Sequence, residues 1–337
     1  MKTNISRYLF IKKMVSLIAI VLAMLLASCS VISEEKPTGG KTEPPISAVP
    51  QAGQTNKYTA SLYFRYADEY LLSSETRVMD IPSNERIEAT IVRALIKGPL
   101  PANTELYPVI NPKTKVGSVS DNGEFLFITL SKDFLLPFGD EPQDYLTNPD
   151  WTEKVWERQR LGLYSIINTL TELGQFSSIQ VFVDVDGTGY GQRIKLKDAG
   201  FAGDPDEEQP LEPQLRQDSL ILTPGRALEN TLKLLMDRDY SKAYGYLNQK
   251  YIQDGLTEEQ LKEALNGSDK TLEDFDIVGE NVSGDGKSAI VTIDCTVAGK
   301  NGDSVHKSAI PMRLVRVNEC WKLTYEALGH IYSLSAK

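Results

Sequence analysis

Two segments rich in proline and charge divide the chain into parts that can build a core. Residues 30–57 consist mostly of Ser, Thr, Pro, Gly, Gln and Glu, and residues 203–219 alternate acidic side chains with prolines. Segments of this composition bury too little apolar surface to offset the entropy lost on folding. The sequence therefore predicts two folded domains, residues 58–202 and 220–337. A flexible tether at 29–57 precedes them and an extended acidic linker at 203–219 separates them.

The first 28 residues have the organisation of a secretory leader. Residues 1–13 carry four basic side chains and no acid, and residues 14–26 form an apolar run of 13 residues. A helix needs roughly 20 apolar residues to span a bilayer, so a membrane-spanning helix is disfavoured. We therefore interpret residues 1–28 as a signal peptide that is removed.

The leader closes with the sequence Leu26-Ala27-Ser28-Cys29, which resembles the lipobox of bacterial lipoproteins. The resemblance implies cleavage before Cys29 and attachment of a diacylglyceryl group, with palmitate among the acyl chains. It also implies that the mature chain is lipid-anchored on the extracytoplasmic side of the cell membrane.

The charge of the mature chain argues against nucleic acid as a partner. Removing the four basic residues of the leader from the 36 in the chain leaves 32, against 46 acidic residues, a formal net charge of −14. Binding to phosphates needs clustered Lys and Arg, and no such cluster occurs. Long-range attraction to anionic headgroups or wall polymers is disfavoured for the same reason.

The pattern of residues 58–202 predicts a small α+β domain. Alternation from residue 58 to 66 predicts a strand, and helical spacing predicts helices over 84–97, capped by Ser83 or Asn84, and over 150–173, starting in a capping box at Asp150. Two further strands form a hairpin around Asp121-Asn122-Gly123, and a last strand covers 179–185. The second hairpin strand, 124–130, is apolar on both faces and should be central. This order predicts two helices on one side of a small sheet.

Several spaced motifs of this region, in the same order, resemble the GerMN domain family. They are Leu62-Tyr63-Phe64, the helix end at 94–99, the strand and turn at 127–134, and the helical stretch at 167–173. The resemblance implies a non-enzymatic module outside the membrane of sporulating bacteria, similar in build to ring-building domains of secretion and sporulation complexes. The proteins that gave the family its name carry two tandem copies, whereas this chain carries one.

Residues 220–337 predict helices followed by a curved antiparallel sheet. Helices are expected from residue 224, from 239 and, with a capping box at Thr257 and Gln260, from 257. Strands follow near 273–282, 287–298, 305–317 and 320–327, and a two-residue turn at Asn318-Glu319 makes their apolar faces coincide. The pattern resembles the cone-shaped fold of the nuclear transport factor superfamily. The expected fold class is α+β in two domains, each with helices packed on a mainly antiparallel sheet.

The same register predicts that Cys295 and Cys320 are free thiols. Cys295 should lie on the inner face opposite Ser308, and Cys320 on the outer face opposite Val317. They would be about 30 Å apart along the strands, whereas a disulfide requires Cα atoms within roughly 7 Å.

Two short motifs suggest chemistry that their context does not support. Asp184-x-Asp186-x-Thr188-Gly189 opens like a calcium loop, but its twelfth position is Lys195 in place of a bidentate Glu, so a simple turn is favoured. Ser304-x-x-Lys307 has the spacing of penicillin-recognising enzymes without their companion motifs, and we interpret it as coincidence.

Metal, cofactor and catalytic sites are not expected. The chain has two histidines, His306 and His330, too few for the usual zinc sites. By the predicted register His306 lies on the concave face near Val297, where it is most simply a polar rim residue. Trp151 and Trp156, beside a long loop, are either an interface or a staple under that loop.

Together with the resemblance to GerMN domains, which implies the link to sporulation or spore germination, these observations predict a non-enzymatic, lipid-anchored interaction or scaffold protein of the cell envelope. Its expected partners are the membrane, through the lipid on Cys29, and envelope proteins or further copies of itself. The alternative is a non-catalytic module that senses wall fragments or a small molecule in the cone-shaped domain.

Replacing Cys29 with Ser is expected to release the protein from membranes without unfolding either domain, because the change removes only the atom that carries the lipid. Fractionation of cells into membrane and soluble material, with circular dichroism of the released protein, measures both effects. A variant that stays in the membrane fraction would contradict the lipobox.

Overall fold

The computed structural model describes residues 55–201, 203, 206–249 and 257–333. The expected signal peptide, the lipobox with Cys29 and most of the expected tether lie outside these residues. The described residues all belong to one compact unit, Pro50–Lys337. Among them, no helix is both long and apolar enough to cross a membrane.

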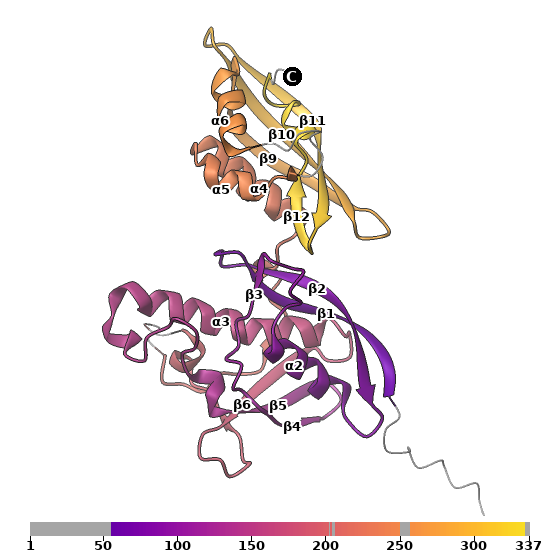
Figure 1. Cartoon of the computed structure of the whole chain (residues 1–337), viewed down its shortest axis with the longest axis vertical. Coiled ribbons are helices and arrows are strands. Elements are labelled where there is room, and N and C mark those ends of the chain that lie inside the picture. The colour runs from indigo at the N-terminus through magenta and orange to yellow at the C-terminus, as the bar shows by residue number, and fades with distance from the viewer. Residues whose placement is uncertain (1–54, 202, 204–205, 250–256, 334–337) are drawn as a thin grey trace, which may run out of the picture. The chain divides into compact units, whose positions relative to one another are not determined.

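We refer to the elements from β1 to β8 as the N-terminal lobe (Figure 1). Its strands are β1 (Thr55–Tyr66), β2 (Leu72–Pro82), β3 (Leu106–Tyr107), β4 (Val116–Asp121), β5 (Phe125–Ser131), β6 (Ser178–Asp184), β7 (Gln192–Arg193) and β8 (Gln214–Leu215). Its helices are α2 (Ile87–Lys97) and α3 (Pro149–Thr171), with short 3-10 turns at Lys132–Leu135, Tyr145–Thr147, Lys197–Ala199 and Asp218–Leu220.

The N-terminal lobe has three layers where the sequence predicts two. One sheet has the order β2-β1-β3 and the other β4-β5-β6-β7, with β8 also pairing to β6. Both helices contact β1 of the first sheet and a strand of the second, so they lie between the sheets (Figure 1). The expectation of one sheet with helices on one side is wrong because β2, an alternating strand absent from the prediction, pairs with β1 along its whole length. The expected central position of β5 is confirmed.

Over its second half, helix α3 is buried on nearly all sides, as expected for a helix that packs between two sheets. Strand β1 approaches it closely enough for hydrogen bonds: the Ser165 hydroxyl donates to the Tyr63 carbonyl oxygen at 2.6 Å, and the Tyr63 amide donates to Thr169 Oγ1 at 3.1 Å. At Gly162 a Cβ atom would lie 2.7 Å from the carbonyl oxygen of Val109. Only glycine therefore fits at this position.

The starts of both helices differ from the expected caps. Helix α2 begins after Arg86 with no side-chain cap, because β2 extends to Pro82 and the turn between them occupies Ser83 and Asn84. Helix α3 is capped by Asn148, whose side chain accepts a hydrogen bond from the backbone amide of Asp150 at 3.2 Å. A proline follows the cap, in the first turn, where its missing N–H has no cost.

Described residues of the expected acidic linker pack on the N-terminal lobe. Glu208 forms ion pairs with Lys195 and Lys197, which lower its pKa to about 2, and Glu212 pairs with Arg193 at 3.0 Å. Strand β8 adds to the sheet beside β6. The acidic charges do not extend this segment by repulsion, because basic residues of the preceding chain pair with Glu208 and Glu212.

The elements from α4 to α7 form the C-terminal lobe. Its helices are α4 (Pro224–Met236), α5 (Tyr240–Gly245), α6 (Glu258–Gly267) and α7 (Tyr325–Leu328). Its strands are β9 (Lys270–Val282), β10 (Ser288–Gly299), β11 (Ser304–Val317) and β12 (Cys320–Leu323), and they form an antiparallel sheet in the order β12-β11-β10-β9. Helix α4 contacts all four strands. The expected fold class, α+β in two parts, is confirmed.

Much of the predicted register in this sheet is confirmed. Asn318 and Glu319 both have positive φ, 49° and 66°, and form the two-residue turn. Leu314 pairs with Leu323 on one side and with Ala289 on the other, as expected. The capping box of α6, at residues 257 and 260, is also present. The last strand ends at 323, not 327, because the chain turns into α7.

A bulge in β11 changes the register near its N-terminal end. Cys295 pairs with Lys307, not with Ser308 as predicted. Within the bulge, Ala309 has φ 55° and donates its amide hydrogen to Asp294 Oδ1 at 2.7 Å. Because of the extra residue, every β11 side chain before the bulge lies on the face of the sheet opposite to the predicted one.

Both described cysteines are free, as expected, and both are buried, although only Cys295 was expected in the core. Cys320 pairs with Val317 on the outer face of the sheet, a position that implies exposure. The N-terminal lobe covers this face, however, and Cys320 is buried. Burial, with Glu105 nearby, raises the pKa of the Cys320 thiol to about 12.

A buried lysine joins the two lobes. The ammonium of Lys322, on β12, donates hydrogen bonds to Tyr66 Oη at 3.0 Å and to Glu105 Oε1 at 2.5 Å in the N-terminal lobe, and to the carbonyl oxygen of Gly245. Its side chain is 5% exposed. A second basic residue, Arg316, donates to the Ser74 carbonyl oxygen at 2.7 Å. These contacts were not predicted from the sequence.

Replacing Lys322 with Ala is expected to lower the free energy of unfolding by about 2 kcal/mol, since it removes charge-assisted hydrogen bonds and leaves buried acceptors unpaired. Urea denaturation followed by tryptophan fluorescence measures the change. The exposed Lys300 provides a control, and equal effects of K322A and K300A would contradict the role of the buried ammonium.

The two thiols are expected to react slowly with iodoacetamide at pH 8 in the native chain lacking Cys29, and rapidly in denaturant. The raised pKa keeps Cys320 protonated, and the thiolate is the reactive form. Mass spectrometry of the alkylated chain measures both rates. Fast native modification of Cys320 would show that the N-terminal lobe does not cover it.

Candidate interaction site

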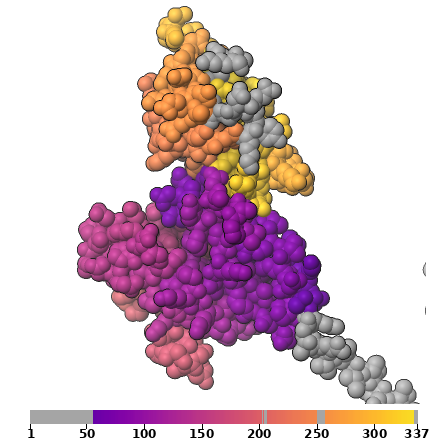
Figure 2. All heavy atoms as spheres, in the orientation of Figure 1, coloured from indigo at the N-terminus to yellow at the C-terminus, as the bar shows by residue number. Residues whose placement is uncertain are grey.

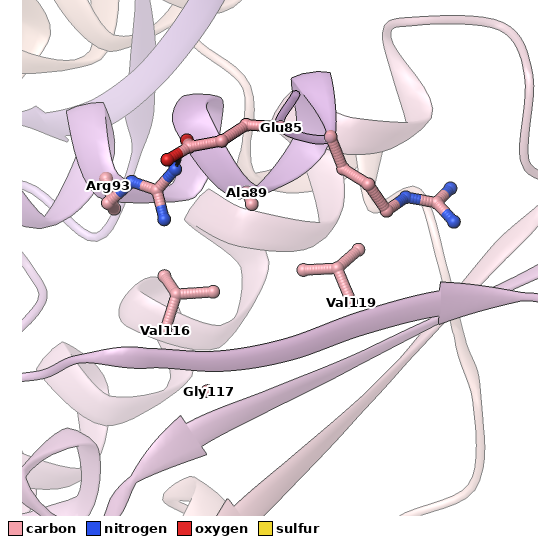
Figure 3. A pocket seen from close by; sticks show the side chains of 7 residues that line it. Glu85, Ala89, Arg93, Val116, Gly117 and Val119 are labelled. Atoms are coloured by element: carbon pink, nitrogen blue, oxygen red, sulfur yellow. Dashed lines mark hydrogen bonds and ion pairs between the residues drawn. The ribbon is translucent and has the colours of Figure 1, made fainter. Parts of the chain in front are cut away.

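A hollow of about 210 Å³ lies between α2 and β4 in the N-terminal lobe. Figure 3 shows Val116 and Val119 pointing from β4 toward Ala89 on α2. Ala89 and Gly117 are small, and they leave the space that larger residues at these positions would fill. The floor of the hollow is therefore apolar and open to solvent.

Ion pairs form the rim of this hollow. Glu85 and Arg93 pair along one side (Figure 3). On the other side Arg86 contacts Asp121 at 2.6 Å and Glu88 at 3.1 Å. The hydrogen bond from Arg86 holds the pKa of Asp121 below its usual range. These charged groups are paired with each other, so the hollow has a charged rim without a free acid or base.

Strand β4 lies at the edge of its sheet, next to the hollow. It pairs with β5 on one side, and within the described residues no strand pairs with its other side. Its sequence from Val116 to Ser120 has neither a lysine nor a proline, residues that often block an exposed edge. A register shift near Gly117 bends its first half. Backbone donors and acceptors of β4 are thus open to a further strand.

The outer face of the same sheet carries a group of half-buried phenylalanines. Phe127 on β5 and Phe182 on β6 have ring centroids 6.3 Å apart, and Phe125 lies on the same face of β5. The neighbouring outward residues of β4 are Ser118 and Ser120, which are too small to cover the rings. Apolar side chains therefore lie on both faces of the sheet next to its free edge.

Trp151 and Trp156 lie in the first turns of α3, and both are half-buried. The ammonium of Lys154 lies 5.3 Å from the centre of the Trp151 ring. The preceding loop is held to α3 by an ion pair of Arg158 with Glu141 at 2.9 Å. This end of α3 lies at the surface (Figure 2, magenta). Their role as an interface stays a prediction, and they do not lie with the residues of the hollow.

The loop that opens like a calcium site is a turn between β6 and β7. The carboxylate of Asp184 accepts hydrogen bonds from the backbone amides of Thr188 at 3.1 Å and Gly189 at 2.9 Å. Both of its oxygens thus stabilise the turn. Among the described residues, no group of three or more His, Cys, Asp or Glu is placed to hold a metal ion.

The remaining candidate residues of the C-terminal lobe do not form a site. Because of the bulge, His306 pairs with Thr296 and is exposed, so its predicted position on the concave face is wrong. Its ring shares a 3.1 Å hydrogen bond with Ser308. Ser304 donates to Glu273 and Lys307 to a carbonyl oxygen in another part of the lobe, each at 2.7 Å. These separate partners are consistent with the interpretation that the Ser-x-x-Lys spacing is a coincidence.

The edge of β4 and the hollow beside it were not predicted from the sequence. One signal was available, because the strand over 124–130 is apolar on both faces. Half-buried apolar side chains on the second face of a sheet are typical of an interaction surface.

Part of the N-terminal lobe matches a known protein family. Residues 61–188 match the model of a family described as "Germane: Sporulation and spore germination". No curated protein matches the chain.

Two solved structures are similar to part of the chain. The tandem GerMN domains of the sporulation protein GerM from Bacillus subtilis are 16% identical, with a TM-score of 0.31 over 51% of this chain and 50% of that one. A protein from Clostridium perfringens, provisionally described as a lipoprotein, is 21% identical, with a TM-score of 0.27 over 48% of this chain and 89% of that one. The chain thus spans half the length of the Bacillus subtilis structure. The family match, residues 61–188, lies within the N-terminal lobe and identifies that region as similar to Germane domains.

Proposed function

We propose that this protein is a lipid-anchored, non-enzymatic interaction protein on the extracytoplasmic side of the cell membrane, with a role linked to sporulation or spore germination. The match of residues 61–188 to the Germane family supports the biological context. The leader and Cys29 support the anchor, since their arrangement resembles that of bacterial lipoproteins. We also infer that the C-terminal lobe is related to the nuclear transport factor superfamily, on the order of its helices and strands.

The observation that carries an interaction role is the free edge of β4. An extended segment of a partner can add to such an edge through backbone hydrogen bonds, while pockets beside it accept alternate side chains. Here the side chains on one face would meet Val116 and Val119, and those on the other face would meet Phe127. The paired charges around the hollow suit recognition by shape better than acid–base chemistry.

The occupant of this edge is proposed to be an extended segment of another envelope protein. Self-association through two β4 edges is the competing arrangement. The two arrangements can be separated with a photo-crosslinking residue placed at Ser118 of the full anchored protein, in sporulating cells of the source bacterium. They differ in the mass of the crosslinked product. We expect a single heterologous adduct, identified by mass spectrometry.

Replacing Val119 with Lys is expected to weaken this adduct at least about tenfold, because it places a charge where apolar contacts form and costs roughly 1.4 kcal/mol or more of binding free energy. Stability should change by less than about 1 kcal/mol, since Val119 is half-buried. Val305, 54% exposed in the C-terminal lobe, is the matched control. The proposal fails if crosslinking from Ser118 gives no adduct, or if V119K and V305K reduce it equally.

A further inference from the structure

A second hollow, of about 160 Å³, lies in the C-terminal lobe. It is formed where α4 and α5 meet the end of α6 and the start of β9. Its lining is mostly polar, but it includes four buried residues with apolar side-chain surface: Leu235, Leu265, Leu272 and Tyr332. A dry cavity of about 150 Å³ holds a molecule the size of benzene. The hollow is therefore large enough for a small organic ligand.

Two basic residues, Arg238 and Lys270, line the same hollow. Within the described parts of the chain, neither side chain takes part in a hydrogen bond or a salt bridge. Acidic residues are close in sequence, namely Asp237, Asp239 and Asp269, but none of them lines the hollow. Asp239 caps α5, and Asp269 is hydrogen-bonded to Ser333. The lining thus carries positive charge that no protein carboxylate neutralises by direct contact.

Arg238 is held in an unusual backbone conformation. It has φ 60° and directly follows the C-terminal cap of α4, where glycine is the common residue. A side chain in this left-handed region strains the backbone, so glycine would be less costly. Strain of this kind is often found where the side chain has a functional role.

Tyr332 also lines the hollow. The residue is 6% exposed, and its hydroxyl forms no hydrogen bond with another described residue. Burial raises the pKa of Tyr332, so the hydroxyl stays protonated and can donate. A ligand with an acceptor oxygen would satisfy it.

We propose that this hollow binds a small organic anion, with its charged oxygens near Arg238 and Lys270 and its apolar body against Leu265 and Leu272. The two cations and the tyrosine hydroxyl favour an anion, and the leucine side chains in the lining offer contacts to one with a hydrocarbon part that a bare inorganic ion would lack. A site here fits the alternative expectation of a module that binds a small molecule in the C-terminal domain. Such a site is independent of the proposed role of β4, which lies in the other lobe.

Sodium benzoate tests the proposal, because it combines a carboxylate with a body the size of benzene. Benzamide has nearly the same shape without the charge, and inorganic phosphate has the charge without the apolar part. Calorimetric titration uses the chain from Ser30 onward. We expect saturable binding of benzoate that weakens with added salt. Benzamide and phosphate should each bind at least about tenfold more weakly, a difference of 1.4 kcal/mol.

Two variants locate the binding. Arg238→Gly removes one cation and suits the positive φ, so the protein should fold at least as stably and bind benzoate about tenfold more weakly. Tyr332→Phe removes only the hydroxyl and should weaken binding severalfold. Lys262→Met, at an exposed position of α6 outside the hollow, is the control. The proposal is overturned if benzoate does not bind up to its solubility limit, if benzamide binds equally well, or if R238G and K262M have the same effect.

Discussion

Helix α3 has to pack against two sheets at once, and the architecture of the N-terminal lobe depends on this constraint. The second half of this helix has almost no solvated face, so its polar residues need partners inside the protein. Ser165 donates to β1, and Thr169 accepts from it. Asn168 exchanges hydrogen bonds with the backbone of Gln217, at 2.8 and 3.1 Å. These bonds hold both β1 and the segment after β8 against α3, which helps to explain why the chain near Gln217 is packed and not extended.

The same packing makes the two edges of the second sheet unequal. On the β6 side, β7 and β8 occupy the edge, and the segment that follows β8 is tied to α3. On the β4 side, α2 covers part of the inner face, but its small residue Ala89 leaves the hollow open. The lobe therefore closes one edge with its own chain and presents the other. An unpaired edge with neither lysine nor proline is a liability for aggregation unless a partner or the local bend protects it. That asymmetry is the physical argument for an interaction surface at β4.

The sequence could predict elements whose signals are local. The turn at Asn318-Glu319, the box at Thr257 and the central position of β5 each depend on a few neighbouring residues, and all agree with the structure. Features that depend on distant residues were missed. The bulge at Ala309 is stabilised by a carboxylate from the next strand, and it moves His306 to the other face. The pairing of Glu208 with two lysines likewise cancels a repulsion that the composition of the linker suggests. For the candidate site, the apolar pattern of β5 was visible in the sequence. The free edge of β4 was not predicted, because whether a strand lies at an edge depends on the order of all strands in the sheet.

The junction at Lys322 determines how specifically the lobes are joined. An apolar contact tolerates sliding, whereas a buried ammonium is stable only where acceptors surround it, since an unpaired buried charge is very costly. The three acceptors of Lys322 come from both lobes: Tyr66 and Glu105 from one, Gly245 from the other. Movement at the junction would therefore have to break charge-assisted bonds together. Gly245 ends α5, the helix that also contributes Tyr240 to the second hollow. The junction and the second hollow thus share helix α5.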